Sequence, residues 1–464
     1  MDEIIKQVLE ELGYDTDLYD AEQRNRVKDW LNWYKGKIKE HTYYVFNGEQ
    51  KIKKQMKSLN IIPQACEDIS DFFFNEKLDI TIDNEELNSK MQDYFKQNNF
   101  LTNSNKLMQL IKALGTGAYV AYLDKDVVRI NYLNATNIVI LESDKNSVKS
   151  VLFYSTQKVK DGTELYINAH LLTDNGYVIE NRRYISKGKE AFIEQELDED
   201  IRHIETKSFL PYFAILTNVA VNNLDIDSPY GISQYANAKD IVLSIDSNYD
   251  SLDIEIVNGK KRLFVKPGAT SFNIDPKSGQ AIPFFDQTET TYYKLPNSNS
   301  DPEVTETNGT LRVDQITNAL QSNLNLFSSK MGLGHNYYKF KDGQVYVNTD
   351  NVLSSNSDVY RKIKKQENII TDAINTLIYA IANLTKVTEK FNISIDYDDS
   401  IIEDTEAIRR QAQIEYNSKL ISKAQYYRDV YHLSDESAVQ FAQQMNDEIK
   451  SETIFDGEEL DLGE

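Results

Sequence analysis

The sequence predicts an α+β chain, with a body of helices and sheets and a smaller β module carried on two long helices. Three observations lead to this prediction. Helical periodicity fills about residues 1–115, whereas β-branched and aromatic runs occupy residues 118–217. Two further helical stripes flank a turn-rich β segment at about residues 261–310. A chain of 464 residues is long enough for two to four domains, so a divided architecture is expected.

The composition excludes several classes of protein. The 51 Lys and Arg residues and 73 Asp and Glu residues give a net charge of −22, which argues against a general basic surface that grips nucleic acid. The single cysteine, Cys66, excludes an intramolecular disulfide and is typical of a reducing compartment. No signal-peptide pattern is present, and no apolar run reaches the roughly 18 residues that span a bilayer. We therefore expect a soluble protein made inside the cell, without a membrane partner.

The first part of the chain is expected to be mostly helical. Helices are predicted at Arg24–Lys39, Lys51–Phe74, Glu85–Phe95 and Asn103–Leu114. The second is interrupted near Pro63, and Gly115-Thr116-Gly117 ends the helical pattern. The whole chain has 29 tyrosines and 19 phenylalanines, a high aromatic load that fits either filled cores or protein interfaces.

Residues 118–217 have a sequence pattern typical of β-strands. Short apolar runs are separated by Asp, Asn and Gly: AYVAYL, VVRINYL, NIVIL, SVLFYS, ELYINAHLL and YFAIL. Such runs predict a mostly antiparallel sheet. Residues 222–227 then link the sheet to a long helix.

A long helix is expected at residues 228–258. Ser228 is a good N-cap, Pro229 suits the first helical position, and Gly231 could split off the first turn. One stripe is apolar and the acidic residues fall mostly on other faces: Ile241, Ile245, Tyr249, Leu252 and Ile256 against Asp240, Asp246, Asp250 and Asp253. Asn258-Gly259 is a plausible end, and a helix of this length spans about 45 Å.

Two more long helices follow the small β module. Leu311–Met331 carries an apolar face formed by Val313, Ile316, Leu320, Leu324 and Phe327. A loop that contains glycine then leads to a helix at about Leu353–Leu384, whose apolar face is Val359, Ile363, Ile370, Ile374, Leu377, Ile378 and Ile381. After the strand FNISIDY, short helices are expected with caps at Ser422 and Ser434, followed by an acidic, disordered tail.

No motif of catalysis or cofactor binding is found. A Walker A sequence and a GxSxG motif are absent, and Gly115-Thr116-Gly117 precedes a strand, so it is interpreted as a turn. The five histidines have no metal-ligand spacing: His41, His170, His203, His335 and His432. The acidic pairs Asp225/Asp227 and Asp398/Asp399 are interpreted as solvated surface, or in the first case as structural near the helix entry. We therefore expect no enzyme activity, no cofactor and no metal.

The order of elements and several local strings resemble a known family. The strings are WLNWYKGK, the SLN…DFFFNEK segment, GTGAYVAYLDKDVVRINYLNATNIVIL, the 227–268 stretch, and GLGHNYYKF followed by a serine-rich entry into a long helix. The chain is similar to the portal proteins of tailed bacteriophages, in the branch typical of long-tailed phages of Gram-positive hosts. The resemblance runs across about residues 25–450.

The resemblance implies a fold described as wing, stem, clip and crown. The corresponding segments are a wing at 1–227, a stem helix out at 228–258, a clip at 259–310, a stem helix back at 311–331, a tunnel loop at 332–352, a long wing helix and strand at 353–397, and a short crown with the acidic tail at 398–464.

The resemblance also implies a function in the virion. We expect a ring of twelve subunits, or thirteen in isolation, at one capsid vertex, assembled in the host cytoplasm. Such a ring passes double-stranded DNA during packaging and ejection, with transient and non-specific contacts. Its expected partners are the terminase large subunit, a head-completion or adaptor protein, and the capsid and scaffolding proteins. An acidic chain with few placed cations fits low-friction passage of DNA.

A few cations are predicted to contact DNA phosphates in the channel. Lys260, Lys261 and Arg262 lie where stem meets clip, and the alternative for them is helix C-terminal capping or a salt bridge between subunits. Lys339 and Lys341, with Tyr337 and Tyr338, lie on the expected tunnel loop, and the alternative for them is a solvated hairpin. Neither group is expected to read bases.

The expected clip is the predicted docking surface for partner proteins. Four aromatic residues lie in a module too small to bury all of them: Phe284, Phe285, Tyr292 and Tyr293. Ordinary packing within the module or between subunits is the alternative for these rings.

Two other functions compete with the portal interpretation. Another non-enzymatic protein of the capsid vertex or tail would share the acidic, aromatic character without forming a DNA channel. A carboxylate-based hydrolase would need acidic residues clustered in a deep pocket, for which the sequence offers no motif.

Overall fold

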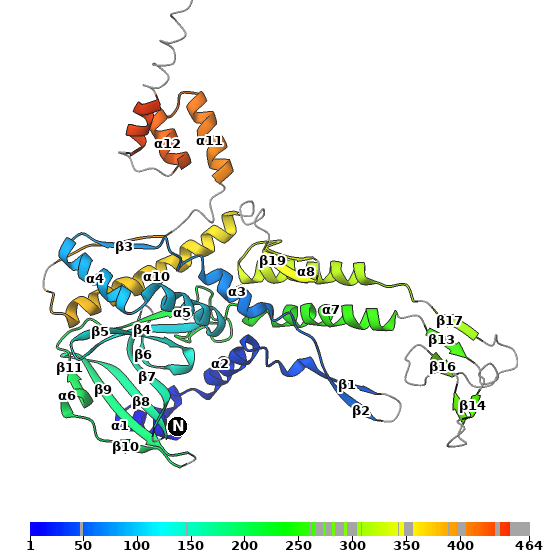
Figure 1. Cartoon of the computed structure of the whole chain (residues 1–464). Coiled ribbons are helices and arrows are strands. Elements are labelled where there is room, and N and C mark those ends of the chain that lie inside the picture. The colour runs from blue at the N-terminus through cyan, green and yellow to red at the C-terminus, as the bar shows by residue number, and fades with distance from the viewer. Residues whose placement is uncertain are drawn as a thin grey trace, which may run out of the picture.

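The computed structural model describes residues 1–46, 50–144, 147–160, 162–188, 190–259, 309–341, 343–347, 356–387, 390–397, 405–431 and 437–445, with five short strands between residues 262 and 307. The fold is α+β, as the sequence predicts. A body of helices and sheets lies at one end of the molecule. Two helices that lie side by side project from this body toward a small group of strands (Figure 1).

The N-terminal part of the body is mainly helical. Its helices are α1 Asp2–Glu11, α2 Ala21–Tyr34, α3 Ile61–Ser70, α4 Glu85–Gln97 and α5 Phe100–Leu114, with 3₁₀ turns at Thr16–Leu18 and Lys39–His41. Asp20 and Asn84 accept hydrogen bonds from the first-turn N–H groups of α2 and α4, which makes them N-caps. These helices lie where the sequence predicts helices, with one exception.

The exception is the helix expected at Lys51–Phe74. Its first part is instead strand β2 Lys51–Gln55, which pairs with β1 Thr42–Phe46 in an antiparallel hairpin. The helix begins only at Ile61, directly after Asn60 in the left-handed conformation at φ 49°. Pro63 therefore does not interrupt a helix but lies in the first turn of α3, where its missing N–H leaves no hydrogen bond unmade.

The rest of the body is antiparallel sheet. The strands are β4 Thr116–Asp124, β5 Val127–Asn134, β6 Ile138–Ser143, β7 Val148–Val159, β8 Gly162–Thr173, β9 Gly176–Ser186, β10 Ile193–Gln195, β11 His203–Glu205 and β12 Phe213–Thr217. One sheet has the order β10-β9-β8-β7-β6, with β11 on β9, and the other has the order β12-β4-β5. The six predicted runs all lie in strands, but β9 was not among them because polar residues 180–183 interrupt its apolar pattern.

Alternation along the strands of the larger sheet builds two separate cores. Leu152 and Tyr154 face α1, where they pack with Ile5, Val8 and Leu9. The residues that alternate with them on the strand, Val151 and Phe153, face the β12-β4-β5 sheet and pack with its residues Ala118, Val120 and Phe213.

The principal core joins the N-terminal helices to the second half of the chain. Helix α10 Asn356–Leu384 buries all seven residues of its predicted apolar face in this core, and it packs on strands β12 and β4. Strand β20 Ile393–Asp396 then pairs with β3 Asp79–Ile82 of the N-terminal part. Segments about three hundred residues apart are thus bound into one body, as the crossing of the yellow helix over the blue and cyan elements in Figure 1 shows.

The first projecting helix starts later than the sequence predicts. Helix α7 is Lys239–Asn258, preceded by a 3₁₀ turn at Ala236–Ala238, and residues 228–235 are not helical. Tertiary contacts hold that segment instead: the Gly231 N–H donates to Thr116 Oγ1 at 3.0 Å and the Gln234 N–H donates to the carbonyl of Lys112 at 2.9 Å. Ser228 and Pro229 therefore do not cap α7.

The second projecting helix agrees with its prediction. Helix α8 is Val313–Met331, with Leu320, Leu324 and Phe327 fully buried. Beyond it, β18 Tyr338–Lys341 and β19 Gln344–Val347 form a hairpin that lies along the helix pair, on the side opposite the β1–β2 hairpin (Figure 1).

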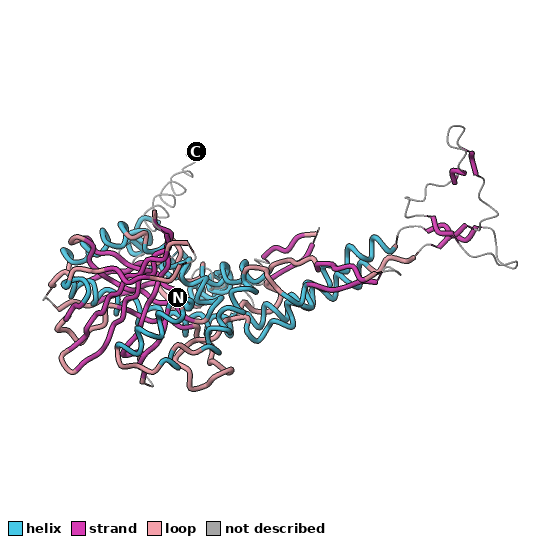
Figure 2. The backbone as a smooth tube through the Cα atoms, turned by 90° about the horizontal axis from the view of Figure 1, so that it is seen from below, coloured by secondary structure: helices cyan, strands magenta, loops and turns pink. Residues whose placement is uncertain are grey.

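The far end of the helix pair carries five short strands. They are β13 Arg262–Val265, β14 Phe272–Ile274, β15 Ala281–Pro283, β16 Tyr292–Lys294 and β17 Val304–Thr307. Strand β13 pairs in parallel with β16 and in antiparallel with β17, and β14 pairs with β15. Both views place these strands far from the body, at the end of the helices (Figures 1 and 2).

A small group of helices follows the body at the C-terminal side. It contains α11 Thr405–Asn417, α12 Lys423–Tyr431 and a helical stretch at residues 437–445, packed around Tyr427, Ala438 and Ala442. The Ser422 hydroxyl accepts the Gln425 N–H at 3.1 Å, which confirms the predicted cap. Ser434 and the acidic tail lie outside the described residues.

Candidate functional site

The two projecting helices are bound together where they meet the strand module. Glu255, near the end of α7, accepts three hydrogen bonds from Arg312, the residue before α8: from its backbone N–H at 3.0 Å, from Nε at 3.1 Å and from Nη2 at 2.9 Å. Hydrogen bonding by Arg312 lowers the pKa of the Glu255 carboxyl. These three hydrogen bonds fix the position of α7 relative to α8 at the end of the pair, where the chain continues into the strands between the two helices.

The β18–β19 hairpin is attached to both helices. The Gln321 side chain of α8 donates to the carbonyl of Tyr338 at 2.8 Å and accepts the Phe340 N–H at 2.9 Å. Tyr249 of α7 packs edge-on against Phe340, with ring centroids 6.4 Å apart. The hairpin therefore has a defined position on the helix pair, and its lysines are carried on an ordered element.

Lys339 and Lys341 occupy different environments on this hairpin. They are opposite Tyr346 and Gln344 in the strand register, with Lys341 exposed and Lys339 half-buried. Neither side chain is buried, and their contact with phosphates stays a prediction.

Tyr337 and Tyr338 lie in the core instead. Tyr338 has no exposed surface, and its hydroxyl donates to Asp68 Oδ2 of α3 at 2.5 Å. Tyr337 is buried beside it, with the two ring centroids 4.9 Å apart. Burial raises the pKa of Asp68 to about 6. Neither ring is placed to contact DNA, because both are used to attach the hairpin to the body.

The other predicted contact residues cannot be located in detail. Lys260, Lys261, Phe284 and Phe285 lie outside the described residues, and the side chains of Arg262, Tyr292 and Tyr293 are also outside them, although these three residues belong to β13 and β16.

Three acidic residues of α7 form a clamp that the sequence did not reveal. We call Asp246, Asp250 and Asp253 the acid clamp. Asp246 is fully buried: its Oδ1 accepts the Leu59 N–H at 2.9 Å and its Oδ2 accepts the Ser58 hydroxyl at 2.9 Å. His41 Nε2 lies 3.0 Å from the same Oδ2, without the alignment of a hydrogen bond. Burial raises the pKa of Asp246.

The other two residues of the acid clamp hold the same part of the chain. Asp250 accepts the Lys57 N–H at 3.1 Å and the Tyr43 hydroxyl at 3.3 Å, and Asp253 forms an ion pair with the Lys57 ammonium. The spacing of four and three residues puts all three carboxylates on one side of α7. They bind both strands at the open end of the β1–β2 hairpin, because Tyr43 is near the start of β1 and Lys57 follows the end of β2.

The acid clamp could not be predicted from the positions of its residues on the faces of α7. The spacing of Asp246, Asp250 and Asp253 was visible in the sequence, but their partners at residues 41–59 are about 190 positions away. Nothing in the local pattern distinguishes a clamp from an exposed acidic face.

A buried lysine of α5, Lys112, has a structural role. Lys112 of α5 donates to Asn218 Oδ1 at 3.0 Å and to Gln366 Oε1 of α10 at 2.8 Å. Burial lowers its pKa to about 7. The nearby Cys66 thiol is also buried, which raises its pKa. Since Lys112 joins three distant segments inside the principal core, we interpret it as a structural tie.

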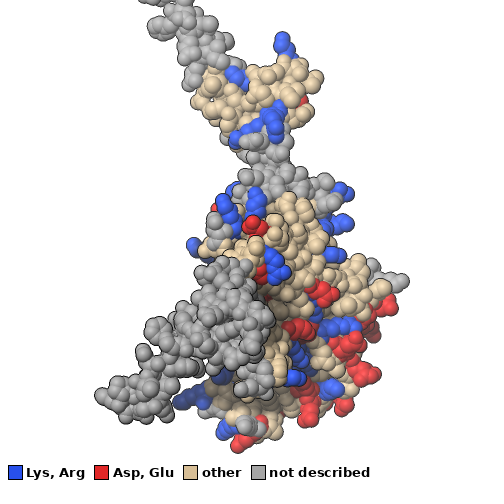
Figure 3. Space-filling view, turned by 90° about the vertical axis from the view of Figure 1, so that its right-hand side faces the viewer, with Lys and Arg blue, Asp and Glu red and all other residues tan. Residues whose placement is uncertain are grey.

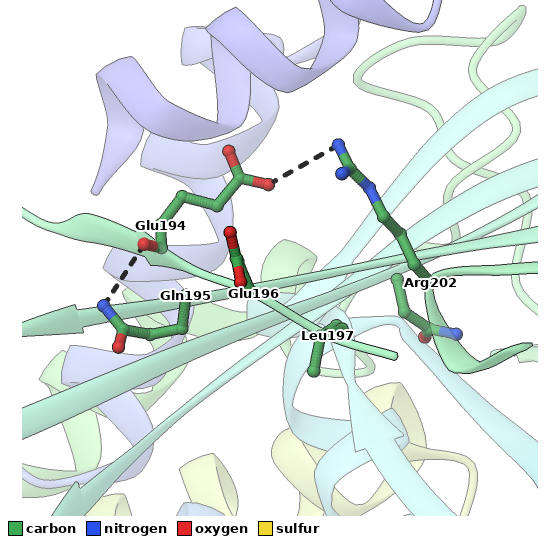
Figure 4. A pocket seen from close by; sticks show the side chains of 6 residues that line it. Glu194, Gln195, Glu196, Leu197 and Arg202 are labelled. Atoms are coloured by element: carbon green, nitrogen blue, oxygen red, sulfur yellow. Dashed lines mark hydrogen bonds and ion pairs between the residues drawn. The ribbon is translucent and has the colours of Figure 1, made fainter. Parts of the chain in front are cut away.

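The cavities of the body contain no catalytic arrangement in the described part of the chain. One cavity of about 230 Å³ is lined by Asn181, Glu194, Gln195, Glu196, Leu197 and Arg202. Figure 4 shows Arg202 and Glu194 facing one another across this cavity. Their side chains form an ion pair with each other, with Nη2 and Oε1 4.0 Å apart. Another cavity, of about 430 Å³, lies between β3, α4 and α5. Among the described residues, no His, Cys, Asp and Glu side chains cluster to hold a metal, and no helix could cross a membrane.

Comparison with known families gives one match. The sequence model of the family described as phage portal protein, SPP1 Gp6-like, matches residues 19–453. This span begins before α2 and includes both projecting helices, the strand module between them and the C-terminal helices. No curated protein matches the chain.

Proposed function

Because this chain belongs to the SPP1 Gp6-like family of phage portal proteins, we propose that it forms a ring of twelve subunits whose channel passes DNA. Portal proteins are structural, non-enzymatic components of an oligomeric assembly at a capsid vertex. In this proposal the ring admits double-stranded DNA during packaging and releases it during ejection. Terminase, head-completion, capsid and scaffolding proteins are its partners.

The projecting helix pair is the observation that supports this proposal most directly. Two helices that leave a body and return to it can line a channel when copies are arranged around an axis. We assign α7 and α8 as the stem, the strands between residues 259 and 310 as the clip and the β18–β19 hairpin as the tunnel loop. The body would be the wing, with α10 and β20 included, and residues 398–464 the crown.

The distribution of charge supports passage of DNA without tight binding. The net charge of the chain is −22. On the face seen in Figure 3, Lys and Arg side chains are spread over the upper and lower parts, whereas most Asp and Glu side chains lie on the lower part of the body. Each lysine that neutralises a phosphate adds salt-dependent affinity, so a lining with few cations lets the duplex slide.

The mass and shape of the purified protein test the proposal. Native mass spectrometry with negative-stain imaging is expected to show a ring of twelve or thirteen copies of the 53.5 kDa chain, with a central hole wide enough for duplex DNA. A compact dimer or tetramer without a channel would exclude a DNA-conducting ring.

Lys339 and Lys341 of the tunnel loop are expected to contact phosphates. Changing Lys339→Ala together with Lys341→Ala should lower packaged DNA on the order of tenfold, because each lost lysine–phosphate contact weakens the hold on DNA. The ring mass should stay unchanged, since both side chains are accessible from outside the chain.

The matched control is Lys125→Ala together with Lys158→Ala, two exposed lysines of the body in the β4–β5 turn and near the end of β7. Packaged DNA should then remain at the wild-type amount. If the Lys339/Lys341 variant packages DNA of normal length and yield, these lysines have no role in the channel.

A further inference from the structure

The β1–β2 hairpin has one face directed at its own chain and one directed away. The Tyr43 hydroxyl donates to Asp250, so the face that contains Tyr43 lies toward α7. Successive strand residues point to opposite sides, which places Tyr44 and Phe46 on the outer face. These two rings are 63% and 69% exposed. We call them, with Lys53 and Lys51 opposite them in the register, the arm face.

The arm face is held in place by the acid clamp at the open end of the hairpin. A two-stranded hairpin alone in water is marginally stable at best. Here the acid clamp binds both strands, through Tyr43 in β1 and through Lys57, Ser58 and Leu59 after β2. Exposed aromatic side chains on an element that is supported in this way are typical of a protein interface.

The hairpin and helix α8 lie on opposite sides of α7. Each residue turns a helix by about 100°. Glu255 binds Arg312 at the start of α8, whereas Asp253, two residues earlier, binds Lys57 of the hairpin. These two side chains are therefore about 200° apart around α7, and Asp246 is about 180° from Glu255. The arm face, on the outer side of the hairpin, thus points away from α8.

Helix α8 exposes the face that points away from α7. Its residue Leu320 is buried in the core that also contains Ile245 of α7. Asn318, two residues earlier, is on the opposite side of the helix and is exposed. Gln321, which holds the β18–β19 hairpin, lies in a third direction, about 100° from Leu320. We call the exposed set the outer α8 face: Asp314, Gln315, Asn318, Ala319 and Ser322.

The arm face and the outer α8 face lie at the same height along the helix pair. The bonds between Arg312 and Glu255 align the two antiparallel helices at one point. From that point toward the body, Asp314 is about 3 Å away, Asn318 about 9 Å and Asp250 about 7.5 Å. The hairpin is bound at Asp250 and extends from there in the direction of α7 (Figure 1). It therefore covers the stretch of the pair that contains Asp314.

The chemistry of the two faces is complementary. The arm face carries two lysines beside two aromatic rings. The outer α8 face carries the carboxylate of Asp314, and Leu311, which is 49% exposed, lies three residues before it. Within the part of the chain that the structure describes, no hydrogen bond or ion pair engages the side chains of Asp314, Lys51 and Lys53. These charged groups are thus available to a second chain.

We propose that the arm face of each subunit docks on the outer α8 face of the next subunit. This inference rests on the proposed ring, because two different patches that pair head to tail generate a ring when the rotation closes. A rotation about the channel axis preserves height along the helices that line the channel and brings opposite sides of neighbouring helix pairs together. The two faces meet both conditions, and within one chain they are separated by the helix pair itself.

Exchange of charges between the two faces tests the pairing. Lys53→Glu is expected to raise the concentration at which rings dissociate by roughly tenfold, and Asp314→Lys to do the same. The two changes together should restore assembly toward the wild-type concentration. The matched controls, Lys158→Glu near the end of β7 and Asp174→Lys in the β8–β9 turn, make the same charge changes at exposed positions of the body and should leave assembly unaltered.

A cross-link between chains gives a second measurement. Tyr44→Cys in one population and Asn318→Cys in another should form a disulfide-linked pair when the populations are mixed before assembly and then oxidised. Tyr44→Cys mixed with Asp174→Cys is the control and should form no such pair. The native Cys66 is buried, which raises its thiol pKa, so it should not compete.

The outcomes separate this inference from the proposed function. Wild-type rings with neither charge rescue nor the cross-link would overturn the pairing and leave the ring intact. A wild-type chain that stays monomeric at all concentrations would overturn both. If Lys53→Glu rings dissociate at the wild-type concentration but no longer enter capsids or bind duplex DNA, the arm face contacts a capsid protein or DNA instead of the next subunit.

Discussion

Replacing Asp246 with alanine is expected to destabilise the chain by about 3 kcal/mol, because it removes the acceptor at the centre of the acid clamp. The Leu59 N–H and the Ser58 hydroxyl would lose their shared partner, and the buried His41 would lose the carboxylate oxygen 3.0 Å from its Nε2. Donors left buried without an acceptor retain their full desolvation cost, which makes this loss larger than that of an exposed ion pair.

The effect should be visible in the hairpin as well as in overall stability. Thermal unfolding should show a lower midpoint, and hydrogen exchange should become faster over residues 42–55, since the hairpin depends on the acid clamp. Asp240→Ala is the matched control on the same helix: Asp240 is exposed, so its removal should cost at most about 0.5 kcal/mol. Equal midpoints and equal hairpin exchange in the two variants would show that the acid clamp does not hold the hairpin.

Replacing Gly115 with alanine is expected to have an effect at least as large, about 4 kcal/mol or more. Gly115 has φ +90°, and a Cβ at this position would lie 2.3 Å from the carbonyl oxygen of Gly231. The same crossing restricts Gly231, where a Cβ would lie 2.2 Å from the carbonyl oxygen of Gly115. Both partners are backbone, so no side-chain rotation relieves the overlap. The contact joins the start of β4 to the segment before α7, and its loss would separate the sheet from that segment.

Gly13 provides the control for the conformational part of this cost. It also has a positive φ, +81°, but nothing lies within 4 Å of a Cβ built there. Gly13→Ala should therefore cost only about 1 kcal/mol, from backbone strain alone. The unfolding midpoint and the soluble yield of the two variants measure the difference. If Gly115→Ala behaves like Gly13→Ala, the crossing of the two backbones is not tight in solution.

The fold was predictable where local pattern and packing agree. Helices α8 and α10 bury the faces that their spacing indicates, and six predicted runs lie in strands of the two sheets. Residues 51–55 were wrongly predicted as a helix because Lys and Gln are good helix formers by themselves. Their pairing with residues 42–46 and the acid clamp decide their structure.

The candidate site was predictable only in part, for a related reason. Lys339, which is half-buried, and Lys341, which is exposed, remain in the proposal as predicted phosphate contacts. The neighbouring Tyr337 and Tyr338 do not remain in the proposal, because both are buried. Tyr338 donates a hydrogen bond to Asp68 of α3, a partner that no local pattern indicates.

The amino-acid pattern alone was sufficient for the fold class, for the order of the elements and for the family, which a match over residues 19–453 shows. These properties depend on backbone periodicity and on turn residues, which act over a few positions along the chain. The late start of α7, the burial of Asp246 and the arm face depended on the folded structure. Each is decided by segments far apart in sequence, such as Gly115 with Gly231 and Ser58 with Asp246, whose contact energies exist only once the chain has brought them together.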